Sequence, residues 1–474
     1  MKKVTVKFLT VFAALFLCWC VSAADSRKQT QNFADVKPVK YVFLFIGDGM
    51  SIPQRMTAEE FNLKNGKGKL FINTMPYQAV TSTSSANSFV TDSAASGTAI
   101  ACGEKTKNGV IGMAADRKRK LESVAYFAKK SGRKVGIITS VTINHATPSA
   151  FYAHNASRGN AYNIGLDLVN SGFDYFGGGG ASSADDKKNK EYKGSIYSLA
   201  AKAGYTVAHG RSAIKAIPKD AEKVFAVGAS GSLRYAIDRT ANDMALAEFV
   251  ADAIKRLDNE KGFFIMAEGG KIDWVGHAND AGTNIHEVID LDNAVKVAYE
   301  FAKKHPSETL IVVTGDHETG GMTLGFAGTA YTSFIENIKY QKISGEAFQQ
   351  KIAALQSKEV VTFEDAKKLI AENYGLIFPE VKDPENSRMV LSKEEFARIT
   401  AAFNRQFPNG KFKKSYALAS EVTKIFNNKC ALSWTTGGHT ALPVLTTAWG
   451  KHSEMFSNFI DNTDISKRLK LVVR

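Results

Sequence analysis

The sequence predicts an α/β fold in which a mostly parallel central sheet carries helices on both faces, with a mainly helical insertion. Three observations indicate this. Short, continuous apolar runs recur along the chain, as expected for strands buried on both faces of a sheet. Segments with helical patterning separate these runs. A stretch rich in Lys, Glu and Gln, from about 328 to 433, interrupts the alternation and predicts the insertion.

The amino-terminal segment is typical of a secretory signal peptide. Three lysines precede an apolar run over residues 8–21, which is too short to span a bilayer as a helix. We therefore expect removal of residues 1–23 and a mature domain over residues 24–474. The expected destination is the periplasm, with secretion or surface tethering left open. Lipid attachment at Cys18 or Cys20 is less favoured, because bulky side chains precede both.

Composition narrows the classes of partner. The 474 residues carry a net charge of +14, and without the first 23 residues 58 basic residues face 47 acidic ones, a net charge of +11. This balance suits an anionic small-molecule substrate or a negatively charged surface. No clustered basic helix or nucleic-acid motif is apparent, so neither nucleic-acid binding nor stable membrane insertion is expected. Only Cys102 and Cys430 would remain, which allows at most one disulfide.

The elements follow one pattern along the chain, because polar motifs stand next to the apolar runs. Residues 41–46, Y-V-F-L-F-I, predict a buried strand that ends at Gly47-Asp48. The other predicted strands are 134–139, 262–267, 309–314 and 442–446, and helices are predicted over 121–130 and 243–257. In open α/β sheets, ligands bind beyond the carboxyl ends of the strands. The polar motifs are therefore expected to meet at one edge of the sheet.

The segment Thr91–Ala99, T-D-S-A-A-S-G-T-A, predicts a capped helix with Ser93 in its first turn. Free backbone N–H groups and the helix dipole favour an anion there, which suits a serine that attacks phosphorus. The alternative is an ordinary alanine-rich core helix. A serine needs a base or a metal ion to become a nucleophile, and no histidine is near in sequence. Arg158 is a candidate clamp for phosphate oxygens, with a surface ion pair as its alternative.

One candidate metal site combines three residues from two motifs. Asp273 and His277, in I-D-W-V-G-H, are four positions apart and would lie on the same side of a helical turn. His439, in T-G-G-H-T, could complete the set. Two nitrogen ligands and one carboxylate leave a position open on a tetrahedral zinc ion, the pattern of a catalytic site. The alternative is a surface helix pair without metal.

Two further sets of candidate ligands follow from the remaining motifs. Asp48, Asp316 and His317 form a second zinc set, with room for an exchangeable oxygen such as that of the serine. Glu268 and Thr147, joined by the second carboxylate oxygen of Asp48, supply only oxygen ligands, which suit magnesium. An Asp-His dipeptide in a turn and a threonine before proline are the alternatives without metal.

Taken together, the motifs resemble those of the alkaline phosphatase family. They are D-G-M, T-D-S-A-A-S-G-T-A, H-A-T-P-S-A-F-Y-A-H-N-A-S-R, E-G-G-K-I-D-W-V-G-H, T-G-D-H-E-T-G-G and G-G-H-T, in this order. The resemblance covers most of the mature chain except the insertion. It implies a three-layer α/β sandwich, a homodimer, and hydrolysis of phosphate monoesters through a phosphoserine at Ser93. It also implies two zinc ions and one magnesium ion in the three sets named above, with Arg158 on the phosphate.

Two positions depart from the best-known bacterial pattern of that family. His145 stands where many bacterial members carry Asp beside the magnesium, and Trp274 stands where they carry Lys beside the phosphate. We expect altered magnesium affinity and looser retention of phosphate. Cys102 matches a cysteine of animal relatives and is expected to be a buried free thiol.

Other functions remain open at this level. A relative from the same superfamily could cleave phosphodiesters or sulfate esters, and a non-catalytic, secreted phosphate-binding protein could retain the scaffold. The physiological substrate does not follow from the sequence. The insertion could line the entrance to the site, mediate assembly, or form a passive surface excursion.

Overall fold

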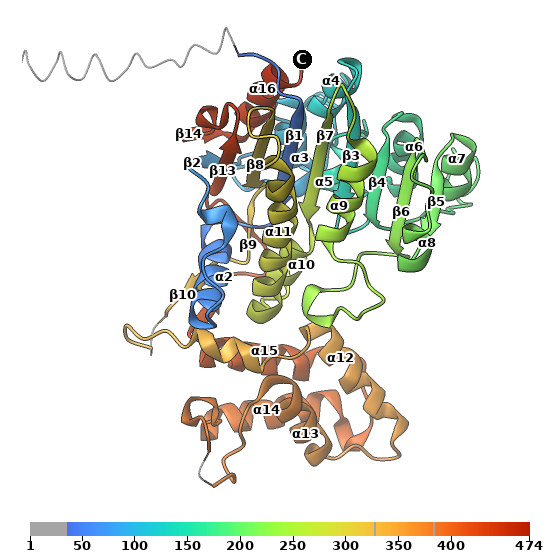
Figure 1. Ribbon diagram of the computed structural model, residues 1–474. Coiled ribbons are helices and arrows are strands. Elements are labelled where there is room, and N and C mark those ends of the chain that lie inside the picture. Colours follow the sequence, from blue (N-terminus) through green and yellow to red (C-terminus); the bar gives the residue numbers. More distant parts are fainter. Residues whose placement is uncertain (1–35, 327–328, 383) are drawn as a thin grey trace, which may run out of the picture. The chain divides into compact units, whose positions relative to one another are not determined.

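A computed structural model describes residues 36–326, 329–382 and 384–474 of the chain (Figure 1). The chain divides into a short first unit, Met1–Lys37, and a second unit, Pro38–Arg474, which carries every element described below. The signal-peptide prediction for residues 1–23 lies outside the described residues. Within the described ranges, none of the helices combines the length and the apolar character that a membrane span requires.

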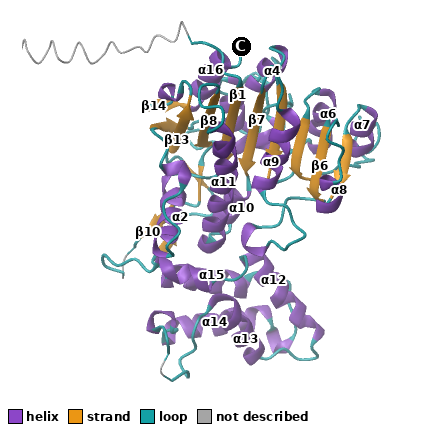
Figure 2. Cartoon of the chain, in the orientation of Figure 1, coloured by secondary structure: helices purple, strands orange, loops and turns teal. Residues whose placement is uncertain are grey.

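A ten-stranded sheet forms the centre of the second unit (Figure 2). Its strand order is β14-β2-β13-β8-β1-β7-β3-β4-β6-β5. Neighbouring strands are parallel, except that β13 is antiparallel to both β8 and β2. The mostly parallel sheet expected from the sequence is thus confirmed. The strands are β1 Tyr41–Gly47, β2 Tyr77–Ser82, β3 Lys134–Thr139, β4 Tyr175–Gly179, β5 Thr206–His209, β6 Val224–Ala229, β7 Phe263–Gly269, β8 Thr309–Gly315, β13 Val444–Gly450 and β14 Asn458–Asp461.

The register of the three central strands determines where the site forms. β1 is buried along its whole length, as its apolar sequence predicts. Gly47 at its carboxyl end is opposite Gly269 of β7 and Gly315 of β8. The three strands therefore end at the same level, and the polar residues that follow them emerge at one edge of the sheet.

Helices cover both faces of the sheet. On one face, α9 and α11 pack on the central strands, and α2 packs against α11; α9 and α11 lie in front of the strands in Figure 1. On the other face, α4 and α5 contact the sheet, and α3 and α16 pack beside them. The helices are α2 Ile52–Lys64, α3 Ser93–Cys102, α4 Val124–Lys130, α5 Ala146–Ser149, α6 Ala161–Asn170, α7 Ile196–Lys202, α8 Arg211–Lys215, α9 Leu246–Leu257, α10 Lys271–His277, α11 Ala281–Ala302 and α16 Asn462–Val472.

Some predicted boundaries are wrong, and the reasons are local or topological. The helix predicted from residue 121 begins at Val124, because Ser123 caps it by accepting from Tyr126 N. The helix predicted from residue 243 begins at Leu246. The strand predicted over 442–446 begins at Val444, continues to Gly450 and runs antiparallel to β8. Its amino-terminal end, and not its carboxyl end, therefore faces the site.

The region of the chain between strands β8 and β13 is mainly helical, as predicted. Its described helices are α12 Gly345–Ala354, α13 Phe363–Tyr374, α14 Lys393–Gln406 and α15 Ala417–Lys429, with short 3-10 turns between them. Two short strands, β10 Met322–Leu324 and β11 Leu432–Trp434, pair antiparallel on either side of this region, with Leu324 opposite Leu432. The chain therefore leaves and re-enters the part that contains the ten-stranded sheet at adjacent points. The limits 328 and 433 stay a prediction.

Candidate metal centre and active site

The predicted nucleophile lies at the start of α3. Asp92 caps this helix by accepting from Ala95 N at 3.0 Å, and Ser93 is the first helical residue and is buried. The small residues of α3 allow close packing. A Cβ at Gly97 would lie 3.2 Å from Thr147 Cα, which is tighter than an ordinary contact, so glycine lets α3 lie this close to α5 without displacing it. The serine is thereby brought beside the ends of β1 and β8.

The first predicted ligand set converges on one point. His277 Nε2 is 3.4 Å and His439 Nε2 is 3.5 Å from Asp273 Oδ1, and the two nitrogens are 3.2 Å apart. Each Nδ1 is engaged elsewhere, with Gly437 O at 2.7 Å and Thr91 O at 2.8 Å respectively. These outer hydrogen bonds orient both rings so that Nε2 is free for a metal ion.

Two local features bring this set together. α10 carries Asp273 and His277 on one side, as predicted. His439 arrives through a two-stranded sheet in which β12 His439–Thr440 pairs antiparallel with β9 Glu318–Thr319. A Cβ at Gly49, which has φ +75°, would lie 2.8 Å from Asp273 Cα, so the turn after β1 requires glycine there.

The second predicted ligand set adjoins the nucleophile. His317 Nε2 is 3.2 Å from Asp48 Oδ1 and 3.5 Å from Asp316 Oδ2, and all three side chains are fully buried. Ser93 Oγ lies 3.2 Å from His317 Nε2 and 3.5 Å from Asp48 Oδ1. The serine–histidine contact could not be seen in the sequence, because 224 positions separate the two residues.

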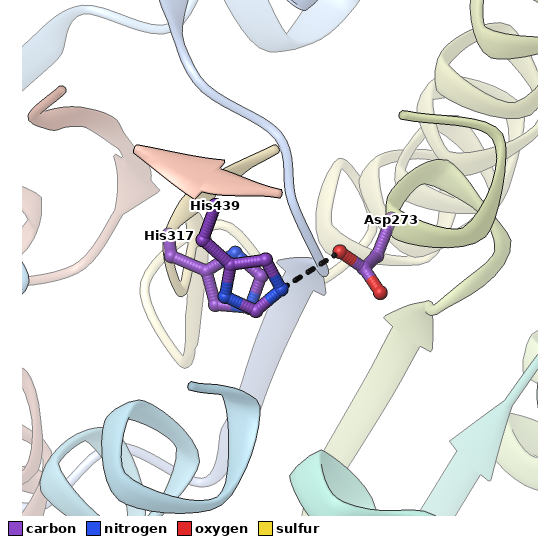
Figure 3. Close-up of side chains that lie close together, drawn as sticks. All are labelled: Asp273, His317 and His439. Atoms are coloured by element: carbon purple, nitrogen blue, oxygen red, sulfur yellow. Dashed lines mark ion pairs between the residues drawn. The ribbon is translucent and has the colours of Figure 1, made fainter. Parts of the chain in front are cut away.

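The two sets share a boundary. The rings of His317 and His439 stack with centroids 3.7 Å apart, and Asp273 faces them both (Figure 3). Ligand atoms of these three residues lie within 4.8 Å of one another, as do those of the second set. His317 therefore belongs to both groups by distance, which the sequence analysis did not anticipate. Two cations at this place would be close neighbours.

The third predicted set lies on the other side of Asp48. Asp48 Oδ2 accepts from Thr147 Oγ1 at 3.4 Å, and Glu268 accepts from Thr139 Oγ1. Ligand atoms of Asp48, His145 and Glu268 lie within 4.8 Å of one another. Glu268 Oε1 and His145 Nδ1 are buried and have no hydrogen-bond partner in the part of the chain that the structure describes. Two unsatisfied buried ligand atoms are expected where a cation completes the site.

The site contains several buried carboxylates that a bound cation would stabilise. Asp48, Asp316 and Glu268 are fully buried, and among the described residues none of them pairs with lysine or arginine. Burial, and then neighbouring carboxylates, hold the pKa of Asp48 and of Glu268 well above their ordinary values. Buried carboxylates without a counter-ion are costly, so the residues present fit divalent metal ions.

The histidines of the site differ in their protonation. A hydrogen bond with Asp273 raises the pKa of His277 to about 9. Burial, and then Arg158, lower the pKa of His145 to about 4. Burial raises the pKa of Asp273, yet hydrogen bonds with His277 and His439 hold it well below its ordinary value. The first set thus carries a proton that a metal ion would displace, whereas His145 is neutral.

Arg158 stands beside the nucleophile, joined to two other residues of the site. Its Nη1 donates to Asp92 Oδ2 at 3.0 Å, and its Nη2 is 3.3 Å from His145 Nε2. The ring of Trp274 meets that of His145 edge-on, with centroids 6.1 Å apart. The structure therefore brings all the predicted site residues together around Ser93.

Several side chains that support the site had no recognisable signal in the sequence. Thr319 Oγ1 donates to Asp273 Oδ1 at 2.5 Å, and Ser96 Oγ donates to Asp316 Oδ2 at 3.1 Å. Thr139 holds Glu268, and Asp92 was expected only to cap a helix. Thr319 and Ser96 stand inside motifs that had been singled out, but nothing in one chain distinguishes them from residues that merely fill a turn or a helix face.

Cys102 and Cys430 are both buried free thiols. The single disulfide that the sequence allowed is therefore not formed, and the prediction of a free thiol at Cys102 is confirmed.

The fold and the site define a metal-dependent hydrolase built on a mixed α/β sheet. The family model for alkaline phosphatase matches residues 39–474. Alkaline phosphatase 3 of Bacillus subtilis is 34% identical over 94% of this chain and 91% of its own length, and alkaline phosphatase 4 of the same organism is 32% identical over 97% and 95%.

Solved structures agree with this result. The cold-active alkaline phosphatase of a psychrophilic Shewanella species matches 92% of this chain and all of its own, with a TM-score of 0.78 and 27% identity. A histidine-to-aspartate variant of the enzyme from the Antarctic bacterium TAB5, with Mg bound in its M3 site, matches 93% of this chain and 99% of its own, at 26% identity and TM-score 0.64. The chain belongs to the alkaline phosphatase family. Its activity is the hydrolysis of phosphate monoesters, and it depends on divalent metal ions.

Proposed function

We propose that Ser93 is the nucleophile of this reaction and that a phosphoserine forms on it. The observation that carries the proposal is the position of Ser93 Oγ, which lies within 3.5 Å of His317 Nε2 and Asp48 Oδ1 at the start of a helix. The free N–H groups of that first turn favour an incoming phosphate dianion. No other serine or threonine in the motif combines this helix position with both contacts.

The proposed metal complement is two zinc ions and one magnesium ion. Asp273, His277 and His439 would hold one zinc ion, and Asp48, Asp316 and His317 the other. Glu268, Thr147 and Asp48 would hold magnesium, with His145 beside it. When bound, divalent ions at these places lower the pKa of a hydroxyl group or water and stabilise charge on the attacking and leaving oxygens.

Ser93, Arg158 and Asp92 have different roles in the two proposed steps of the reaction. Ser93 Oγ forms a bond to phosphorus as the ester P–O bond breaks and the alcohol leaves. Water next attacks the phosphoserine, the Ser93 O–P bond breaks, and inorganic phosphate is released. Arg158 would donate two parallel hydrogen bonds to non-bridging oxygens, and Asp92 holds its guanidinium beside the helix start.

Replacing the nucleophile tests this proposal. Ser93→Ala should lower kcat by at least about a thousandfold, because the covalent route is lost. Acid quenching of wild-type turnover should trap phosphate on the peptide that contains Ser93, as seen by mass spectrometry. Ser96→Ala, one turn further along α3, is the matched variant and should lose far less activity. Trapped phosphate in Ser93→Ala, or equal losses in both variants, would refute the assignment.

Metal analysis tests the cofactor assignment. We expect about two zinc and one magnesium per chain in the active protein. Chelation should abolish turnover, and zinc with magnesium should restore it. The Mg reported in the M3 site of the TAB5 variant belongs to a protein with Asp in place of a histidine. By analogy, His145→Asp should retain more magnesium per chain than the wild type does, because it offers a hard oxygen ligand.

Phosphomonoesters are distinguished from other esters by the same site. Arg158 and the complete third metal set favour a dianionic phosphate group over a diester or a sulfate ester. Initial rates on an aryl phosphate, an aryl phosphodiester and an aryl sulfate should be highest for the first.

We further propose a homodimer and export with cleavage after residue 23. Support for assembly comes from β14, an edge strand that exposes Phe459 at 70%, since unpaired sheet edges tend to find partners. Sedimentation of the purified protein should give the mass of two chains. Sequencing of the exported protein should begin at Ala24.

A further inference from the structure

A buried lysine next to the site has no part in the proposed chemistry. Lys271 opens α10, and its side chain is only 3% exposed. Among the described residues its Nζ forms no ion pair, and its single hydrogen bond runs to Ser232 Oγ at 3.3 Å. An ammonium group carries three donors and is costly to bury; the carboxylates of Glu287, Glu346 and Asp238 offset part of this cost, but none of them lies within ion-pair distance.

Two aromatic rings lie close to this cation, and the carboxylates of Glu287, Glu346 and Asp238 act on it electrostatically from further away. Lys271 Nζ lies 3.4 Å from the centroid of the Tyr235 ring and 5.0 Å from that of the Trp274 ring. Tyr235 is itself buried. Trp274 follows Lys271 by three positions on α10, so the two side chains project from the same side of the helix. An ammonium group over aromatic faces is held by the ring quadrupoles, most strongly where water is excluded.

Trp274 depends on such contacts for its orientation. Trp274 is half-buried. Within the described residues its indole N–H has no hydrogen bond, and its ring contacts there include Lys271 on one flank and His145 on the other. His145 in turn lies 3.3 Å from Arg158, which is bound to Asp92 at the start of α3. A continuous series of contacts thus runs from the buried lysine to the helix that carries the nucleophile.

We propose that Lys271 is a positioning residue for phosphate binding: its ammonium group fixes the indole of Trp274 against His145, which keeps Arg158 aligned for the phosphate oxygens. This inference rests on the proposed role of Arg158. It predicts an effect on binding of substrate and phosphate rather than on the chemical step, because Lys271 touches neither the nucleophile nor the metal ligands.

The experiment compares inhibition by inorganic phosphate and steady-state kinetics on an aryl phosphate in the metal-loaded enzyme. Lys271→Met should raise the KM and the phosphate inhibition constant about fivefold, with kcat changed less than about twofold. Lys271→Arg should restore both constants to within about twofold, since a guanidinium also stacks on aromatic rings. Lys429→Met removes another buried lysine, in the insertion, and should leave both constants unchanged.

A double-mutant cycle separates positioning from a general structural role. If Lys271 acts through Trp274, Lys271→Met should have no further effect on the phosphate inhibition constant in a Trp274→Ala background. An equal effect in both backgrounds, or wild-type constants for Lys271→Met, would overturn the proposal. If Lys271→Met does not fold, Lys271→Gln takes its place in the same cycle.

Failure of the proposed function would look different. In that case the Arg158→Ala variant would have the same phosphate inhibition constant as the wild-type enzyme, whatever the Lys271 variants do.

A fluorine NMR spectrum of 5-fluorotryptophan protein gives an independent readout. The Trp274 resonance, identified by its absence in Trp274→Phe, should broaden or shift in Lys271→Met and return in Lys271→Arg. An unchanged resonance would also overturn the proposal.

Discussion

At the scale of single residues, the site is defined by a group of buried carboxylates and by the uncharged aromatic side chains next to them. Asp48, Asp316 and Glu268 form a buried cluster of acids without a lysine or arginine partner among the described residues. Beside this cluster lie an indole and a neutral imidazole, Trp274 and His145, in place of the lysine and the aspartate of the best-known bacterial pattern. Phosphate retention should therefore respond strongly to charge introduced at either position.

Trp274→Lys should tighten inhibition by inorganic phosphate by about three- to tenfold, because a cation close to a bound dianion lowers its free energy even through partial solvation. The measurement is the inhibition constant for phosphate in the metal-loaded enzyme. Trp274→Phe serves as the control, since it changes the ring without adding charge. No tightening in Trp274→Lys, or the same change in both variants, would contradict the electrostatic explanation.

At the scale of elements, two carboxylates outside the helical insertion accept hydrogen bonds from the start of its first helix, α12. Asp280 caps α11 by accepting from Thr283 N at 3.1 Å, and it also accepts from Gly345 N at 2.7 Å at the start of α12. Asp238 accepts from the backbone and the hydroxyl group of Ser344, which caps α12. The start of α12 is therefore anchored three residues after His277, the last residue of α10.

Asp280→Ala should lower the free energy of unfolding by about 2–4 kcal/mol, because a buried charged acceptor of several hydrogen bonds is lost and their donors stay buried. Urea unfolding of the metal-loaded protein measures this change. Thr362→Ala, which removes the exposed cap of α13 within the insertion, should cost about 1 kcal/mol or less. A smaller loss for Asp280→Ala than for Thr362→Ala would show that the junction contributes little.

At the scale of the whole molecule, stability is linked to protons and metal ions at the same site. The pKa of His277 is raised to about 9 from an ordinary value near 6.5, through its hydrogen bond with Asp273. This contribution is complete below about pH 6.5 and is lost as the pH rises through 9. The raised pKa values of Asp48 and Glu268 act in the same direction, because these buried carboxyl groups are destabilising once they ionise.

The metal-free protein should consequently lose stability as the pH rises from about 6 to about 9, whereas the metal-loaded protein should not. Metal ions need deprotonated ligands and gain affinity with rising pH, so the difference in Tm between the two forms should widen. Thermal unfolding with and without chelator measures it. His277→Gln should make the metal-free curve flatter. A Tm difference that narrows towards pH 9 would contradict this linkage.

Local patterns in the sequence determined a large part of this molecule. The apolar run at 41–46 predicted a strand buried on both faces, the small residues after Asp92 favoured a closely packed helix, and the spacing of Asp273 and His277 indicated a shared side of a helical turn. These features depend on neighbours in the chain, so one sequence suffices to predict them. Together with the motif order, they identified the fold class, the family and the reaction.

Only the tertiary structure decided how these pieces meet. The antiparallel course of β13, the pairing of β12 with β9 that delivers His439, and the contact of His317 with both ligand groups depend on strand register between distant segments. Lys271 shows the same limit, because nothing in its motif indicates that Tyr235 covers its ammonium group. Register and ring packing are set by long-range burial, which the periodicity of a single segment does not encode.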